Sequence, residues 1–79
     1  MRVSVKLFAM LSRYAQGNAA GAPFEVEVPE GATLQDLLQQ LNIPPDETKI
    51  VFVNGVIQSL DCRLNPEDIV GIFPPIAGG

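Results

Sequence analysis

The sequence contains no histidine and a single cysteine, Cys62. Without an imidazole there is no histidine base, no Cys–His pair and no histidine ligand for a metal ion. With one thiol, neither an internal disulfide nor a thiolate zinc site can form within the chain. We therefore expect no bound metal and no ordinary side-chain catalysis by this chain alone.

Basic residues and long apolar runs are also scarce. The chain has nine acidic and five basic residues, so its formal net charge is -4. Such a domain has no electrostatic attraction to nucleic-acid phosphates or anionic lipids. The longest apolar run begins at Ile69 and is stopped by Pro74, far short of a membrane span. The charged segment 1–6 has no signal-peptide character. These features predict a cytoplasmic protein with no nucleic-acid or membrane partner.

What is present suffices for one folded domain. The chain has 79 residues, of which 47% are hydrophobic and 18% charged, a balance typical of a globular protein. At this size a chain buries only about 60% of the surface that its unfolded form exposes. One hydrophobic core is therefore expected, whereas a catalytic cleft enclosed on all sides would be hard to build.

Several stretches have the patterns of β-strands. In residues 2–9, Val3, Val5 and Leu7 share one face while Ser4, Lys6 and Phe8 share the other, which indicates a half-buried strand. Residues 50–53 are apolar on both faces, as in a central strand covered on both sides, and residues 69–73 have the same pattern. The expected strands are 2–9, 24–28, 50–53, a return beginning at 56–57, and 69–73.

One helix is predicted clearly. Thr33 is a good N-cap with Asp36 at the third helical position, close to a capping box. Four leucines follow at helical spacing and form a single apolar stripe, and the helix is stopped by Asn42, Pro44 and Pro45. A second, shorter helix is expected over residues 10–15. The stripe consists of Leu34, Leu37, Leu38 and Leu41.

Two turns complete the plan. Asn54-Gly55 is typical of a type I′ hairpin, and residues 65–68 of a type I turn. The order of elements predicts an α+β fold of the β-grasp, ubiquitin-like kind, with a mixed sheet of four or five strands packed on one main helix. We expect residues 1–73 to form this domain and residues 74–79 to form a flexible, projecting functional tail.

The tail ends in Gly78-Gly79. Pro74 and Pro75 stiffen its stem, and six extended residues reach on the order of 20 Å. A carboxylate is a poor electrophile until ATP converts it to an acyl-adenylate, which must form in a partner's pocket away from water. Residues without a Cβ can thread a narrow channel to such a pocket. We therefore predict that Gly79 is the reactive terminus, with Gly78 beside it.

At this point the sequence resembles a known family. The ending VGIFPPIAGG, residues 70–79, is similar to the C-terminus of the molybdopterin synthase small subunit of the MoaD/ThiS sulfur-carrier family. Residues 5–9 resemble the first strand of that family, and residues 53–55 its hairpin. The Pro74-Pro75 pair favours the molybdopterin branch, because thiamine-pathway carriers usually lack it. Arg13 is displaced from the position of the basic residue that the family usually places after its first strand.

The resemblance implies a sulfur carrier that is not catalytic alone. A ubiquitin-activating-like enzyme would adenylate Gly79 with ATP, and a sulfur donor would displace AMP to leave a thiocarboxylate. The tail would then enter the large subunit of molybdopterin synthase, where the sulfur passes to a pterin precursor for a molybdenum or tungsten cofactor. The chain itself would hold no permanent cofactor, since the ATP is used by the activating partner.

Apolar residues near the tail are candidates for contact with these partners. Phe8 lies on the polar face of the first expected strand, Phe73 precedes the tail, and Ile57 follows the hairpin turn on a strand expected near a sheet edge. Exposed apolar groups beside a functional segment mark a partner site, although Phe8 and Ile57 could instead be core residues. Similar positions in the family form the partner interface, and the remaining candidates are the tail residues Pro74, Pro75, Ile76 and Ala77.

Other acceptors use the same chemistry. The chain could carry sulfur for thiamine, cysteine or tRNA thiolation, or it could be a ubiquitin-like modifier joined to lysines through Gly79. A β-grasp interaction domain with an irrelevant tail is a further alternative. Cys62, in a turn with no second cysteine and no base, is expected to be a tolerated turn residue rather than a sulfur relay.

Overall fold

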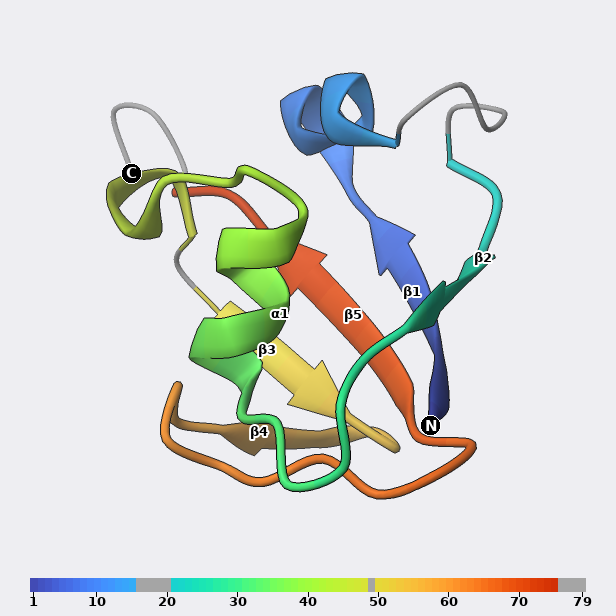
Figure 1. Ribbon diagram of the computed structural model, residues 1–79. Helices are drawn as coiled ribbons and strands as arrows, with labels where there is room; N and C mark the ends of the chain where they lie inside the picture. Colours follow the sequence, from blue (N-terminus) through green and yellow to red (C-terminus); the bar gives the residue numbers. More distant parts are fainter. Residues whose placement is uncertain (16–20, 49, 76–79) are drawn as a thin grey trace.

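The computed structural model describes residues 1–15, 21–48 and 50–75, which form one mixed sheet with one main helix. The strand order is β2-β1-β5-β3-β4, in which β1 and β5 are parallel and the other neighbours are antiparallel (Figure 1). The predicted β-grasp plan is confirmed. The strands are β1 (Arg2–Leu7), β2 (Phe24–Glu27), β3 (Ile50–Val53), β4 (Val56–Gln58) and β5 (Ile69–Phe73).

The helix α1 (Leu34–Gln40) begins as the sequence predicts. The Asp36 backbone N–H donates to Thr33 Oγ1 at 3.3 Å, and the Thr33 N–H donates to Asp36 Oδ2 at 3.0 Å, which completes the capping box. Past its C-terminal end, Asn42 adopts a φ of 62°, a left-handed conformation that ends helices. The chain can then turn back toward the sheet.

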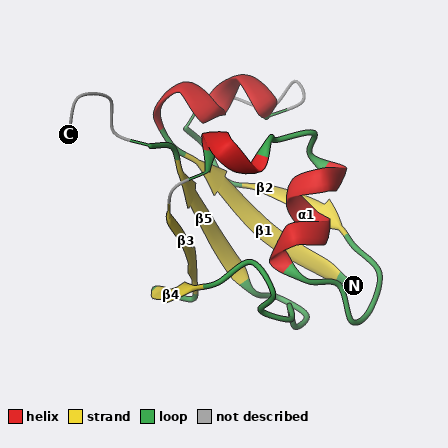
Figure 2. Ribbon diagram, turned by 90° about the vertical axis from the view of Figure 1, so that its left-hand side faces the viewer, coloured by secondary structure: helices red, strands yellow, loops and turns green. Residues whose placement is uncertain are grey.

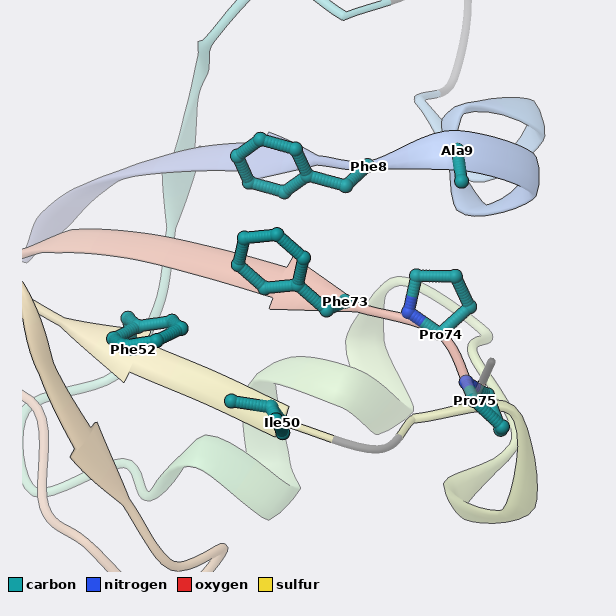
Figure 3. A pocket seen from close by; sticks show the side chains of 7 residues that line it. All are labelled: Phe8, Ala9, Ile50, Phe52, Phe73, Pro74 and Pro75. Carbon is teal, nitrogen blue, oxygen red and sulfur yellow. The ribbon is translucent and has the colours of Figure 1, made fainter. Parts of the chain in front are cut away.

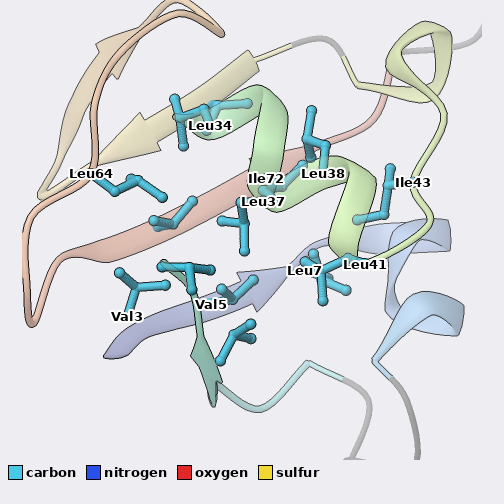
Figure 4. Close-up of a cluster of buried hydrophobic side chains, with 14 of the residues drawn as sticks. Val3, Val5, Leu7, Leu34, Leu37, Leu38, Leu41, Ile43, Leu64 and Ile72 are labelled. Carbon is cyan, nitrogen blue, oxygen red and sulfur yellow. The ribbon is translucent and has the colours of Figure 1, made fainter. Parts of the chain in front are cut away.

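The core lies between α1 and one face of the sheet (Figure 4). The inward residues of β1 and β5 alternate along each strand as the period of two requires. The leucine stripe of α1 packs against them, so the predicted core role of the stripe is confirmed. Fully buried members include Leu7, Leu34, Leu37, Leu38, Leu41, Ile72, Val3, Val5 and Val70.

The short helix expected over residues 10–15 is a 3-10 helix, η1 (Ala9–Tyr14), and a second one, η2 (Pro45–Glu47), follows α1. The Leu11 N–H donates to the Phe8 carbonyl, three residues back, and the Ser12 hydroxyl donates to the Ala9 carbonyl at 3.0 Å. The Ala15 N–H donates to the Ser12 carbonyl at 3.1 Å, again three residues back, which is the spacing of a 3-10 helix.

The two predicted turns have different outcomes. Asn54 and Gly55 have φ values of 52° and 84°, as the type I′ hairpin requires. The type I assignment for residues 65–68 was wrong, because Glu67 at the third position has a φ of 69°, which fits type II. The Glu67 N–H donates to the Arg2 carbonyl at 2.8 Å, so a contact with β1 fixes the orientation of the central peptide.

The tail begins where β5 ends. Phe73 closes the strand, and Pro74 and Pro75 have no N–H with which to continue its hydrogen bonds. Ile76, Ala77, Gly78 and Gly79 lie outside the described residues, so the division into a domain over 1–73 and a tail over 74–79 stays a prediction. Within the described part of the chain, no helix has the length and apolar character needed to cross a membrane.

Candidate functional site

The face of the sheet opposite α1 carries apolar side chains that nothing in the described chain covers. Figure 2 shows α1 on one side of the sheet. On the other side, Ile50 and Phe52 of β3 are only half-buried, and Ile69 of β5 is 62% exposed. The expectation that β3 is covered on both sides was therefore wrong. The sequence pattern of an apolar strand does not distinguish a face that is covered by the same chain from a face that is covered by a partner.

Three of the four phenylalanines gather on this outer face. The rings of Phe8 and Phe73 stack with centroids 4.0 Å apart and planes 7° apart. Phe52 meets Phe73 edge-on at 5.5 Å and 72°. Stacked and edge-to-face pairs are the favourable aromatic geometries, so the rings hold one another in place without a covering layer. Figure 3 shows the three rings side by side across the ends of adjacent strands.

Sheet register extends this group to three further residues, the first of which is Ile50, opposite Phe73. Phe52 lies opposite both Gly71 on β5 and Ile57 on β4, so Ile57 shares its face and is 61% exposed. A Cβ at Gly71 would lie 3.4 Å from the edge of the Phe8 ring, so the missing side chain lets that ring lie over the strand. We call this surface the aromatic face. It comprises Phe8, Ile50, Phe52, Ile57, Gly71 and Phe73.

The aromatic face continues into the stem of the tail. A hollow of about 570 Å³ opens here, and every residue that lines it is apolar. Figure 3 shows Pro74 and Pro75 leading away from Phe73 at the border of this hollow. A partner that fills the hollow would therefore also hold the root of the tail. The lining residues are Phe8, Ala9, Ile50, Phe52, Phe73, Pro74 and Pro75.

A polar clamp joins the two 3-10 helices. Arg13 of η1 donates to Glu47 Oε1 of η2 at 2.6 Å, and the Tyr14 hydroxyl donates to the same oxygen at 3.1 Å. The hydrogen bond to Tyr14 and the charge of Glu47 raise the pKa of Arg13 above its ordinary value. The charge of Arg13 is therefore paired within the chain. Arg13, which is displaced from the family's basic position, has a structural role here.

A second polar group fixes the hairpin that carries Ile57. Asp68 is buried; its Oδ1 accepts from Asn54 Nδ2 at 2.9 Å and its Oδ2 accepts from the Asn65 N–H at 2.8 Å. Asn54 Oδ1 accepts from the Ile69 N–H at 2.9 Å. The hairpin turn is therefore bound to the start of β5, and the strands of the aromatic face keep one relative orientation.

The structure brings together four of the residues chosen from sequence. Phe8, Phe73, Pro74 and Pro75 line one hollow, and Ile57 lies on the neighbouring edge strand of the same face. The predicted contact residues Ile76 and Ala77 and the predicted reactive terminus Gly78-Gly79 fall outside the described residues. Cys62 is half-buried against the core.

Sequence reasoning missed four members of the site. They are Ala9, Ile50, Phe52 and Gly71. For Phe52 a signal was available, because a two-residue hairpin at Asn54-Gly55 sets Phe52 opposite Ile57 and therefore on the same face. The described residues contain no cluster of three or more His, Cys, Asp or Glu that could hold a metal ion. What the site offers is an exposed apolar surface with a hollow at the base of the tail.

Comparison with known proteins places this geometry in a family. Among solved structures, one assigned to molybdopterin converting factor subunit 1 of Pyrococcus furiosus is 29% identical with a TM-score of 0.73, over 95% of this chain and 98% of that one. SAMP1 of Haloferax volcanii is 26% identical with a TM-score of 0.73, over 100% of both chains. A chain of the complex of subunits 1 and 2 of molybdopterin-converting factor from Helicobacter pylori 26695, at 19% identity, 100% coverage of both chains and a TM-score of 0.63, shares the fold.

Sequence comparison supports the same assignment. No curated protein matches the chain significantly. A sequence model of the ThiS family, however, matches residues 5–79, from β1 through the C-terminal Gly-Gly. Because this match spans nearly the whole chain, the resemblance of the C-terminal motif is confirmed, and the chain belongs to the ThiS family, within the MoaD/ThiS group of sulfur carriers and ubiquitin-like modifiers.

Proposed function

We propose that this protein carries sulfur on Gly79 for the assembly of molybdopterin. In this proposal an adenylating enzyme joins the Gly79 carboxylate to AMP from ATP, releasing pyrophosphate. A sulfur donor then displaces AMP and leaves a thiocarboxylate. The large subunit of molybdopterin synthase takes up the tail, and the sulfur passes to a pterin precursor in the cytoplasm. The carrier is consumed and recharged, so it acts as a co-substrate rather than as a catalyst.

The observation that carries the proposal is the apolar hollow at the root of the tail. Its lining joins Phe8 and Phe73 to Pro74 and Pro75, so a partner that docks there would also direct the tail into its own pocket. The chain has no histidine and a single cysteine, which assigns the acid–base chemistry to the partners. The likeness to the Pyrococcus furiosus subunit supports the molybdopterin pathway.

Mass spectrometry of the intact chain tests this proposal. The protein is incubated with the adenylating enzyme of its own organism, ATP and a sulfur source. We expect a mass gain equal to the replacement of one oxygen by one sulfur at Gly79, and none when ATP is omitted. The thiocarboxylate form is then mixed with the large subunit and the pterin precursor, where loss of that sulfur identifies the pathway.

A second function is favoured by one comparison. SAMP1 of Haloferax volcanii, the small archaeal modifier protein 1, is 26% identical over 100% of this chain. In this alternative the adenylated Gly79 forms an isopeptide bond with a lysine of another protein, and AMP leaves. An unchanged carrier mass together with Gly79-linked lysine peptides in the same reaction would replace the sulfur-carrier proposal with this one.

A further inference from the structure

The outer face of the sheet is divided into a charged part and an apolar part. On the β2–β1 side, Arg2 lies 3.3 Å from Glu27 and 3.6 Å from Glu25, and the N-terminal ammonium lies 3.8 Å from Glu27, so two cations pair with two carboxylates within the chain. On the β5–β3–β4 side lies the aromatic face. Lys6 stands at the boundary, because it is opposite Gly71 in the sheet register and two residues before Phe8.

Lys6 is a cation without an acidic partner in an acidic protein. Arg2, Arg13 and the N-terminus each form an ion pair, but no carboxylate of the described residues lies within 4.0 Å of Lys6. Its Nζ is 5.1 Å from the centroid of the Phe8 ring. The strand neighbour Gly71 offers no side chain beside it. The ammonium group is therefore held against the aromatic face and stays open to an incoming surface.

A partner that covers the aromatic face also takes water away from Lys6. Removing water from an ammonium group is costly unless an opposite charge replaces it. A carboxylate on the partner, placed among the apolar groups that fill the hollow, would satisfy this need and fix the orientation of docking. A second copy of this chain fits the requirement less well, because Glu25 and Glu27, the carboxylates on its outer face, already pair with Arg2 and the N-terminal ammonium.

We propose that Lys6 is the recognition cation of the aromatic face, and that the adenylating enzyme presents a carboxylate within an apolar surface to meet it. This inference rests on the proposed adenylation of Gly79. The overall charge of this chain is -4, so the rest of a complementary surface would be basic. At Lys6 the charge of this chain is positive, so the partner needs a negative group at that one point. A shifted docking pose would bring that carboxylate away from Lys6, so the pair favours the correct pose.

The test measures adenylation of the full-length protein by the purified adenylating enzyme, as ATP–pyrophosphate exchange at varied carrier concentration. We expect Lys6→Glu to raise the KM for the carrier by about tenfold or more with little change in kcat, because the lost contact serves binding. Lys6→Met should raise KM by roughly three- to fivefold, and Lys6→Arg should retain the wild-type value. Raising NaCl from about 50 mM to about 500 mM should weaken binding of the wild type more than that of Lys6→Met.

Arg63→Glu is the matched control. Arg63 is exposed, has no ion pair among the described residues, and bridges to Thr33 at the start of α1, on the helix side of the sheet. Equal KM values for Lys6→Glu and the wild type would overturn the inference, as would equal effects of Lys6→Glu and Arg63→Glu, since the latter reports net charge alone. If the wild type is not adenylated at all, the proposed function fails, and the inference that rests on it fails with it.

Discussion

Phe73 connects the fold to the tail at the scale of single residues. It ends β5, stacks on Phe8, meets the edge of Phe52 and lines the hollow beside Pro74. Its ring is half-buried, so part of its apolar surface contributes to the stability of the monomer and part remains available to a partner. The two contributions can be separated by measuring both properties on one variant.

For Phe73→Ala we expect a larger loss of partner affinity than of stability. Truncation of a fully buried phenylalanine costs about 3–5 kcal/mol, and this half-buried ring should cost less, on the order of 1–2 kcal/mol. As an aromatic anchor at a docking site it should reduce affinity for the adenylating enzyme by at least about tenfold. Chemical denaturation and calorimetric titration give the two values.

Leu37→Ala serves as the opposite control. Leu37 is fully buried under the sheet, so its truncation should destabilise the domain by about 2–5 kcal/mol while the folded fraction binds normally. If Phe73→Ala behaves like this control, with a large stability loss and unchanged affinity, Phe73 is a core residue.

The residues of the site were predictable only where a local pattern isolates them. Phe8 stood out because it shares a face with Ser4 and Lys6, and Ile57 because it follows a hairpin turn. Ile50 and Phe52 did not stand out, because an uninterrupted apolar strand is expected to be buried on both faces. Whether such a face is covered depends on how many layers the chain can build, and the described chain builds two, the sheet and α1, so a helix covers only one face of the sheet.

At the scale of elements, the start of β5 is held by backbone and side-chain bonds from three directions. The Ser4 N–H donates to the Asp68 carbonyl at 2.9 Å, Asn54 donates to the Asp68 carboxylate, and Glu67 is bound to the Arg2 carbonyl. These bonds join β1, β5 and the β3–β4 hairpin at one end of the sheet. The aromatic face is built from the same strands, so its geometry depends on this joint.

Asp68→Ala should weaken the hydrogen bonding at the start of β5 and so destabilise the domain. The substitution removes the acceptor of Asn54 Nδ2 and of the Asn65 N–H, two part-buried hydrogen bonds, and a hydrogen bond to a charged group contributes about 1.5–3 kcal/mol. We expect a loss of about 2–3 kcal/mol in the free energy of unfolding, measured by chemical denaturation. Glu30→Ala, at an exposed position, should change it by less than about 0.5 kcal/mol. If Asp68→Ala lowered the free energy of unfolding no more than Glu30→Ala does, the hydrogen bonds of Asp68 would contribute nothing to stability.

Elements defined by local signals were predicted well, and those defined by tertiary contacts were not. The capping box of α1 needs only Thr33 and Asp36, three residues apart, so sequence sufficed. The type II turn before β5 depends on the Arg2 carbonyl, which is far away in the sequence. The apolar spacing of residues 7–15 indicated a helix but did not distinguish the 3-10 form of η1 from an α-helix.

At the scale of the whole molecule, the buried core and the described stem of the tail, Pro74 and Pro75, are separate. The core lies between α1 and the sheet, whereas the tail leaves from the end of β5 beside the aromatic face. No described residue of the hollow belongs to the buried core cluster. Changes at the chain end should therefore leave the domain folded. Variants of the terminus can then test the carrier chemistry without a change in stability.

Deleting Gly79, or adding one residue after it, should abolish sulfur transfer without a change in the midpoint of thermal unfolding. The extension moves the carboxylate by about 3.3–3.6 Å, and an added alanine also brings a Cβ into a channel suited to glycine. In a site where the reacting atoms must align, such a displacement is enough to stop adenylation. Thermal unfolding and sulfur loading are measured on the same preparations. Normal loading of the extended chain would refute the role of Gly79, whatever the stability of the domain.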